Sequence, residues 1–236
     1  MSTEKVAIVI PALNEEAAIR QLLTELPRDF ANWIIVVDNG STDGTASVAQ
    51  AAGVIVASEP TRGYGQACLK GFKAACSLGA EIVVFMDGDG SDDPADLPLM
   101  LEPVREGIAD MTIGSRVSRR SERRAIPPQA RIGNWLVSRM IHILYGTRLH
   151  DIGSFRVIRC ATLDTLGMRE MTFGWPVEML VKMARARYRI VELPIHYRRR
   201  SHGRSKVAGS IVGSIKAAYY MLRTTLRYAW MGGAHA

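Results

Sequence analysis

The stretch VVFMDGDGSDDP, residues 83–94, begins as an apolar run with the length of a buried strand and ends in a cluster of acidic side chains. Four aspartates fall within seven positions: Asp87, Asp89, Asp92 and Asp93. Carboxylates this close together repel one another and add nothing to a hydrophobic core, so a cation is expected to offset them. Asp92 or Asp93 also suits the N-cap of a following helix. Asp87 and Asp89 follow the strand directly, and this pair suits Mg²⁺ or Mn²⁺, which take oxygen ligands and bridge to diphosphate.

Strand-like and helix-like segments alternate through the first half of the chain. Strands are expected at residues 6–12, 33–39, 54–58 and 81–87. Helices are expected between them, at residues 15–26, 45–53 and 63–79. This alternation predicts an α/β fold in which a mixed, mostly parallel sheet carries helices on both faces. Such sheets bind ligands beyond the carboxyl ends of their strands, so the polar loops should converge on one rim: residues 11–16, 38–44 and 87–94.

The second half of the chain is less regular. Helices are expected at residues 94–107, 132–146 and 174–187, and strands at residues 110–116 and 188–197. We see no internal repeat and no clear linker. We therefore interpret residues 1–209 as one domain, followed by a C-terminal amphipathic helix at 210–236. Within that domain, residues 1–115 would form the nucleotide-binding half and residues 116–209 the acceptor half.

The composition limits the class of protein. With 236 residues, 47% of them hydrophobic, the chain can bury a sizeable core. Its net charge of +7 is concentrated at residues 116–124 and 198–206, which indicates an anionic partner. These clusters lack interleaved aromatic residues, which argues against nucleic acid. No window of about 18 apolar residues predicts a membrane-spanning helix. The N-terminus lacks a signal sequence, so a cytoplasmic location is expected. The cysteines lack metal-ligand spacing and are expected to be small buried side chains: Cys68, Cys76 and Cys160.

Four motifs, in this order and at these separations, resemble the family 2 glycosyltransferases, which have the GT-A fold. They are VAIVIPALNEE (6–16), VVDNGSTDGTA (36–46), GYGQACLKG (63–71) and FMDGDGSDDP (85–94). Within that family, the chain is most similar to polyprenyl-phosphate sugar synthases of the dolichyl-phosphate mannose synthase type. Three later motifs carry this likeness: IGSR (113–116), DIGSFRVIR (151–159) and ELPIHYRRRSHGRSK (192–206).

The resemblance implies roles for individual residues. A set of residues would hold the nucleotide sugar: Pro11, Leu13, Glu15, Asp38, Gly65, Gly88, Arg200 and Lys206. Asp87 and Asp89 would form the DxD motif that binds Mg²⁺ or Mn²⁺ and the sugar diphosphate. The acceptor phosphate would lie near Arg116, Arg131 and Ser205. Taken alone, Asp38 could instead form an Asx-turn. One departure from the family pattern is Ser91, which stands where relatives often carry glutamine.

Charge suggests how such an enzyme would work. Loss of the sugar leaves a nucleoside diphosphate, whose developing charge the metal and Arg200 or Lys206 would stabilise. An acceptor phosphate is already ionised and needs cations to position it, whereas a hydroxyl acceptor needs a carboxylate base. Asp151 and Glu178 are the candidate bases, and each could equally cap a helix or pair with an arginine.

The C-terminal segment predicts an amphipathic helix. One side carries Ile211, Ile215, Tyr219, Leu222 and Leu226, and another carries Lys216, Arg223 and Arg227. Such a helix could lie on a membrane surface with Tyr228 and Trp230 at headgroup level, or pack on the domain or a second subunit.

The leading hypothesis is an inverting enzyme that moves a hexose from UDP-glucose or GDP-mannose to polyprenyl phosphate at the cytoplasmic membrane face, as a peripheral protein. A homo-oligomer is compatible with the sequence. The alternatives are a family 2 transferase with a soluble or glycan hydroxyl acceptor, or a non-catalytic nucleotide-binding subunit.

Overall fold

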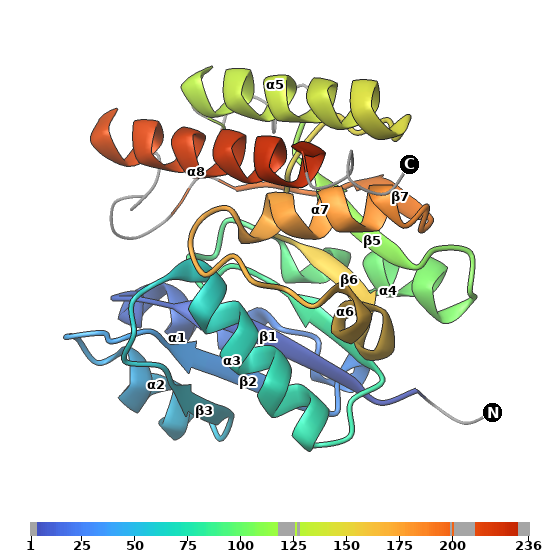
Figure 1. Ribbon diagram of the computed structural model, residues 1–236. Helices are drawn as coiled ribbons and strands as arrows, with labels where there is room; N and C mark the ends of the chain where they lie inside the picture. The colour runs from blue at the N-terminus through green and yellow to red at the C-terminus, as the bar shows by residue number, and fades with distance from the viewer. Residues whose placement is uncertain (1–3, 118–125, 127, 199, 201–210, 231–236) are drawn as a thin grey trace.

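The computed structural model describes residues 4–117, 126, 128–198, 200 and 211–230. In this part of the chain, seven strands form one sheet in the order β3-β2-β1-β4-β6-β5-β7 (Figure 1). The strands are β1 Val6–Ala12, β2 Trp33–Asp38, β3 Ile55–Ser58, β4 Ile82–Phe85, β5 Met111–Ser115, β6 Arg156–Arg159 and β7 Ile190–Pro194. β6 runs antiparallel to both of its neighbours, while the other strand pairs are parallel. The predicted mixed, mostly parallel sheet is therefore confirmed.

Helices cover both faces of the sheet. The α-helices are α1 Glu16–Glu25, α2 Thr45–Ala51, α3 Tyr64–Ser77, α4 Leu97–Arg105, α5 Pro128–Tyr145, α6 Cys160–Leu166, α7 Trp175–Arg185 and α8 Ile211–Trp230. Two short 3₁₀ helices, η1 Arg28–Phe30 and η2 Pro94–Asp96, complete the described elements. Every strand and helix that the sequence predicted is present. The sequence did not predict β6 and α6, because β6 has only four residues and begins and ends with arginine.

The core forms two clusters, one on each face of the sheet. Successive strand residues point to opposite faces, so Val9 of β1 packs with α3 and α7, while Ile8 packs with α1 and α4. Because both faces are covered, β1 is a continuous apolar run. Gly71 lets α3 approach the sheet closely, since a Cβ there would lie 2.2 Å from the Val9 side chain. This packing fixes the strand ends that carry the polar loops.

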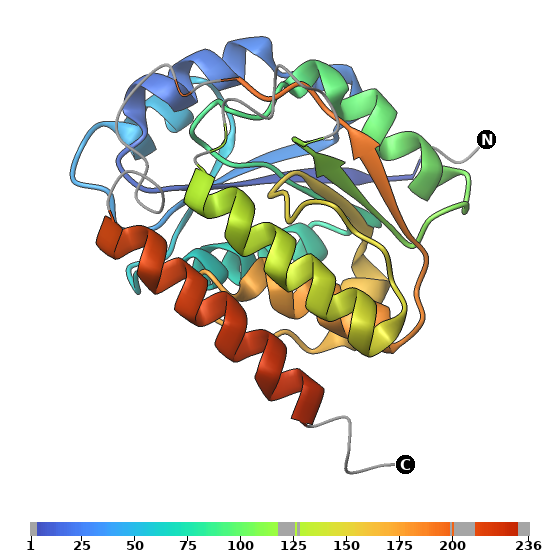
Figure 2. The ribbon, with the colours of Figure 1, turned by 90° about the horizontal axis from the view of Figure 1, so that it is seen from above.

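α5 and α8 lie side by side in an outer layer beyond α7 (Figures 1 and 2). Within the described residues, no helix combines the length and apolar character needed to span a bilayer. All three cysteines are free. Cys68 and Cys160 are buried as expected, but Cys76 is exposed, because it lies on the outer side of α3.

Candidate active site

The aspartate loop begins where β4 ends and folds back against β1. Gly88 makes this possible, because a Cβ there would lie only 3.0 Å from the Pro11 carbonyl oxygen. Gly90 then turns the chain with a φ of +72°, and the Ser91 amide donates to Asp89 Oδ1 over 2.9 Å. The loop therefore holds Asp89 beside the end of β1, as the predicted convergence of loops requires.

Three polar loops meet at Arg200, which lies in the segment after β7. Its Nη1 donates to Glu15 Oε1 over 2.8 Å, and its Nη2 donates to Asp89 Oδ2 over 2.6 Å. Burial opposes the charge on Arg200, but the carboxylates of Asp89 and Glu15 raise its pKa above the ordinary value. The side chain of Arg200 keeps 21% exposure, so the cluster reaches the surface. Residues 15, 89 and 200 are thus brought together from sites 185 positions apart.

The other carboxylates of the loop are crowded. Burial and the neighbouring Asp89 raise the pKa of Asp87 to about 6, although the Tyr64 hydroxyl donates to Asp87 Oδ1 over 2.9 Å. Burial and the charges of Asp87 and Asp89 raise the pKa of Asp92 to about 8. Asp92 Oδ2 accepts from Ser154 Oγ over 3.2 Å, while Asp92 Oδ1 is buried and has no hydrogen-bond partner among the described residues. This excess of acceptors favours a cation.

The residues present fit a divalent ion that is shared with a diphosphate. Among the described residues, no group of three or more acidic, histidine or cysteine side chains forms a complete metal-binding arrangement. Mg²⁺ is usually held by one or two carboxylates together with substrate phosphates and water. Asp87 and Asp89, side by side beyond β4, supply such a pair.

A second ion pair lies at the end of β5. Arg116 donates to both carboxylate oxygens of Asp151, over 2.8 and 2.9 Å, and Asn134 of α5 donates to the same carboxylate over 2.6 Å. Although burial opposes ionisation, Arg116 holds the pKa of Asp151 below its ordinary value. The Arg116 guanidinium also lies 5.2 Å from the centre of the Tyr197 ring. Asp92 is near enough to raise the pKa of Arg116, so this pair borders the aspartate loop.

Comparisons with known proteins agree with this arrangement. The model of the glycosyl transferase family 2 matches residues 7–167. The chain belongs to this family. It is 34% identical over 240 residues to an undecaprenyl-phosphate mannosyltransferase of Micrococcus luteus, covering 97% of each chain. It is 39% identical over 217 residues to an uncharacterized glycosyltransferase of Mycobacterium tuberculosis, covering 92% of this chain and 96% of the relative.

The fold of this family 2 glycosyltransferase is the GT-A fold. It matches a solved glucosyl-3-phosphoglycerate synthase of Mycobacterium tuberculosis with a TM-score of 0.72 and 22% identity, covering 96% of this chain and 80% of the other. That synthase was crystallised with Mn²⁺, uridine diphosphate and glucosyl-3-phosphoglycerate.

The loops after β1 and β2 in this family 2 glycosyltransferase lie where the sequence predicted. Ala12 pairs with Asp38 in the register of the two strands, and the partly exposed Pro11 and Leu13 flank Ala12. Asp38 Oδ1 accepts from the Ser41 amide over 3.0 Å, three residues on, so its side chain stabilises the loop but does not form the Asx-turn, which closes two residues on.

Other predicted residues lie elsewhere in the enzyme. Gly65 allows close packing, because a Cβ there would lie 2.2 Å from the Glu170 carbonyl oxygen. Arg131 lies near the start of α5 and is partly exposed. Ser205 and Lys206 lie outside the described residues.

Glu178 contacts none of Glu15, Asp89 and Arg200 among its described partners. Its carboxylate accepts from the amides of Arg169 and Glu170 and from the Tyr228 hydroxyl, and it pairs with Lys182 Nζ over 2.8 Å. These contacts join α7 to α8 and are structural. The prediction that Tyr228 lies at headgroup level is wrong, because this side chain is only 6% exposed and faces Glu178. The side chain of Trp230 lies outside the described set.

Sequence reasoning missed some residues at the site of this glycosyltransferase. Tyr64 lies in the quoted glycine motif, but nothing in the motif indicates a hydrogen bond to Asp87. Asp92 was a candidate N-cap, yet Asp93 is the cap of η2, accepting from the Ala95 amide over 3.0 Å. Asn134 gave no signal, because its contact depends on how α5 packs.

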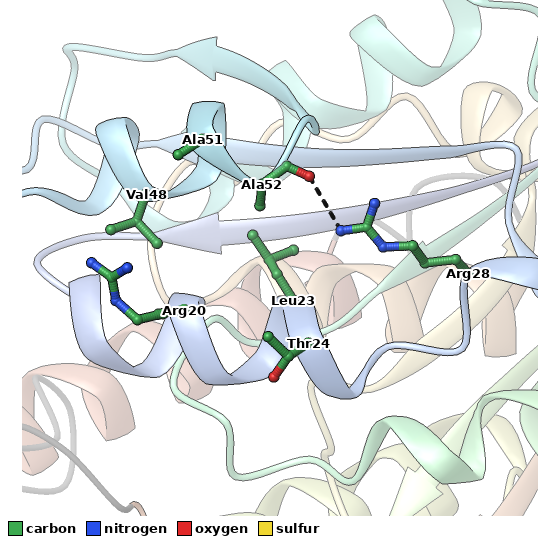
Figure 3. Close-up of a pocket in the computed structure, with 7 residues that line it drawn as sticks. All are labelled: Arg20, Leu23, Thr24, Arg28, Val48, Ala51 and Ala52. Carbon is green, nitrogen blue, oxygen red and sulfur yellow. Dashed lines mark hydrogen bonds between the residues drawn. The ribbon is translucent and has the colours of Figure 1, made fainter.

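A shallow pocket of about 300 Å³ lies between α1 and α2 and is separate from this site (Figure 3). Arg28 crosses it to donate to the Ala52 carbonyl over 3.2 Å. None of the predicted site residues lines it; its lining is Arg20, Leu23, Thr24, Arg28, Val48, Ala51 and Ala52.

Proposed function

We propose that this enzyme is an inverting hexosyltransferase that moves a hexose from UDP-glucose or GDP-mannose to polyprenyl phosphate. One observation carries the choice of acceptor. Both carboxylates that the sequence offered as a base for a hydroxyl acceptor are held in ion pairs, Asp151 by Arg116 and Glu178 by Lys182. An ionised phosphate needs no base. The similarity to the undecaprenyl-phosphate mannosyltransferase over nearly the whole chain supports the same choice.

On the donor side, Asp87 and Asp89 would hold Mg²⁺ or Mn²⁺ against the sugar diphosphate. The metal, when bound, supplies positive charge to the oxygens on which negative charge develops. Arg200 lies within 2.6 Å of Asp89 and would contact the same diphosphate, with Lys206 as a second cation. Glu15, Asp38, Pro11, Leu13 and Gly88 would form the wall that binds the nucleotide.

On the acceptor side, Arg116 would bind the incoming phosphate, assisted by Arg131 and Ser205. Asp151, which accepts from Asn134, and the Ile152 carbonyl hold the Arg116 guanidinium in one orientation through its Nε and Nη2, which leaves the Nη1 N–H groups for a ligand. A fixed cation positions the phosphate for in-line attack at the sugar, which is the main contribution of the enzyme when the nucleophile is already ionised.

We further propose that the enzyme works as a peripheral protein at the cytoplasmic face of the membrane, where a polyprenyl phosphate resides. Residues 1–209 would form the catalytic domain and 210–236 the appended helix. In the structure α8 packs on α5 and α7, so this helix would belong to the same rigid body.

The test is transfer of radiolabelled hexose from a panel of UDP- and GDP-sugars into an organic-extractable product, with polyprenyl phosphate and Mg²⁺ or Mn²⁺. Wild type is compared with Asp89→Asn and with Asp43→Asn, an aspartate of another loop. Metal-dependent lipid product that is lost only in Asp89→Asn supports the proposal. Label that stays in water while nucleoside diphosphate is released indicates a soluble acceptor. Nucleotide binding without turnover indicates a non-catalytic subunit.

A further inference from the structure

α5 carries an apolar stripe on its outward side. The side chains of Ile132, Trp135 and Ile143 are 66%, 64% and 68% exposed. Positions 132, 135, 136, 139 and 143 are three, four, seven or eight residues apart in most pairings, and this spacing places their side chains on one side of the helix. The opposite side is already occupied, because Val137 and Ile141 are buried in the core. The outward stripe therefore contributes nothing to the fold of the described chain.

α8 is the neighbour of α5 and also carries exposed apolar side chains. It packs beside α5 in both views (Figures 1 and 2), and its Tyr219 and Leu226 are 59% and 54% exposed. We call the surface the α5–α8 face and define it by Ile132, Trp135, Arg139, Ile143, Tyr219 and Leu226. An apolar surface that draws on two neighbouring helices is uncommon on a monomeric protein that has no partner.

The charges of both helices have one sign. Residues 128–145 contain two arginines, and residues 211–230 contain two arginines and one lysine; neither segment contains aspartate or glutamate. Arg139 lies within the apolar stripe, and Arg223 and Arg227 are exposed on α8. A second copy of this chain would bring like charges together across a shared interface, which opposes association. An anionic lipid surface matches both the apolar side chains and the cations.

The α5–α8 face is close to the proposed acceptor cation. On the inner side of α5, Asn134 donates to Asp151, which holds Arg116. One helix diameter, about 10 Å, therefore separates lipid-facing side chains from the side chains that fix Arg116. A phosphate whose lipid tail remains in a bilayer against this face would have a short path to Arg116.

We propose that the α5–α8 face docks on an anionic bilayer, with Trp135 and Ile143 entering the headgroup region. The proposal rests on the proposed function only for its purpose, since docking itself needs neither donor nor acceptor. It assigns the main contact to α5, whereas the sequence pointed to α8 alone.

The test is co-sedimentation of the full chain with vesicles of phosphatidylcholine, with or without phosphatidylglycerol. Wild type is expected to bind the anionic vesicles and to be released by salt. The variant Trp135→Ser/Ile143→Ser should bind at least about tenfold more weakly, because two side chains no longer enter the lipid. The matched control is Ile108→Ser, which changes a side chain that is 55% exposed between α4 and β5 and should bind as wild type does. Thermal melting of each variant verifies the fold.

A second measurement locates the tryptophan directly. Brominated lipids should quench part of the fluorescence of wild type, and that part should disappear in Trp135→Ser. The proposal is overturned if wild type does not bind anionic vesicles, or if the double variant binds them as tightly as wild type does. It is also overturned if the double variant only converts a dimer to a monomer in solution.

Transfer to a water-soluble short-chain prenyl phosphate separates this proposal from the proposed function. Wild type and the double variant should transfer equally to that acceptor. Vesicle binding without any transfer would uphold docking and reject the proposed reaction, while transfer without vesicle binding would do the reverse.

Discussion

The molecule contains two arginine–carboxylate clusters that differ in burial and construction. Arg200 pairs with both Glu15 and Asp89, the three residues lie in three separate loops, and the Arg200 side chain is 21% exposed. Arg116 forms a bidentate ion pair with one fully buried carboxylate, that of Asp151. A partly exposed cation that is shared between two carboxylates can exchange partners when a diphosphate arrives. The bidentate pair of Arg116 with the buried Asp151 carboxylate holds one geometry. The proposed donor side can thus rearrange, while the proposed acceptor side stays rigid.

The largest expected effect comes from breaking the rigid pair. Asp151→Asn leaves the Arg116 guanidinium buried and uncompensated, so the free energy of unfolding at pH 7 should fall by about 3–5 kcal/mol. Urea denaturation measures this loss. The matched double variant Arg116→Met/Asp151→Leu removes both charges and should recover much of the stability, but not transfer activity. A loss below about 1 kcal/mol in Asp151→Asn would show that the pair is not rigid.

Arg200→Ala should separate activity from stability. Removing the cation that we propose contacts the leaving group should lower the rate of the proposed hexose transfer by about 10²–10³-fold. The free energy of unfolding should fall by about 1–3 kcal/mol, less than in Asp151→Asn, because the Arg200 side chain is 21% exposed although the Glu15 and Asp89 side chains that it leaves are buried. Single-turnover transfer and urea denaturation measure the two effects. The control is Arg198→Ala, two residues away and paired with Glu25 and Asp93, which should transfer at the wild-type rate. Equal rates for both variants would remove Arg200 from the mechanism.

The two clusters also differ in how far the sequence could predict them. The donor cluster lies in motifs that follow apolar strands, so the rule that ligands bind at the carboxyl ends of strands brings them together. The Arg116–Asp151 pair depends on β6 inserting antiparallel between β4 and β5. Nothing in its four residues indicates this, because Arg156 opens the strand and is nevertheless 2% exposed.

Arg156 is buried because its guanidinium donates to backbone carbonyls. Its Nε donates to Gly153 over 2.8 Å and its Nη1 to Pro176 over 2.6 Å. Burial lowers its pKa to about 10, so it stays charged at neutral pH. A sequence pattern treats arginine as exposed, and only the tertiary arrangement supplies these acceptors. Residues that meet through such contacts, Asn134 among them, were not predictable.

A third prediction concerns the structural carboxylate that joins α7 to α8. Burial opposes its charge, but the hydrogen bonds from Lys182 and Tyr228 hold the pKa of Glu178 below its ordinary value of 4.5. The unfolded chain therefore binds the proton more tightly, and this stabilisation is present above pH 4.5 and lost as the pH falls through the lower folded-state pKa. In Glu178→Gln, the free energy of unfolding at pH 7 should be lower than in wild type. It should also depend less on pH between about 5 and 3, which is roughly the range in which a carboxyl group titrates. An unchanged pH dependence would mean that this group has the same pKa in both states. The transfer rate of Glu178→Gln should stay at the wild-type value, because Glu178 has no contact with the aspartate loop among its described partners.

A surface ion pair gives the smallest expected effect and sets the scale for the other three. Arg189 and Asp110 pair over 3.3 Å, with side chains that are 59% and 25% exposed, at the far end of β5 from Arg116. Burial raises the pKa of Asp110, but the hydrogen bonds from the Arg189 side chain and amide and the Arg189 charge together hold that pKa below its ordinary value. Solvent and salt screen such a pair, so Asp110→Asn should change the free energy of unfolding by only about 0–1 kcal/mol and leave transfer intact. The residual effect should shrink further at high salt. If Asp110→Asn cost as much as Asp151→Asn, burial would not be what distinguishes the acceptor-side pair, and its proposed rigidity would need another cause.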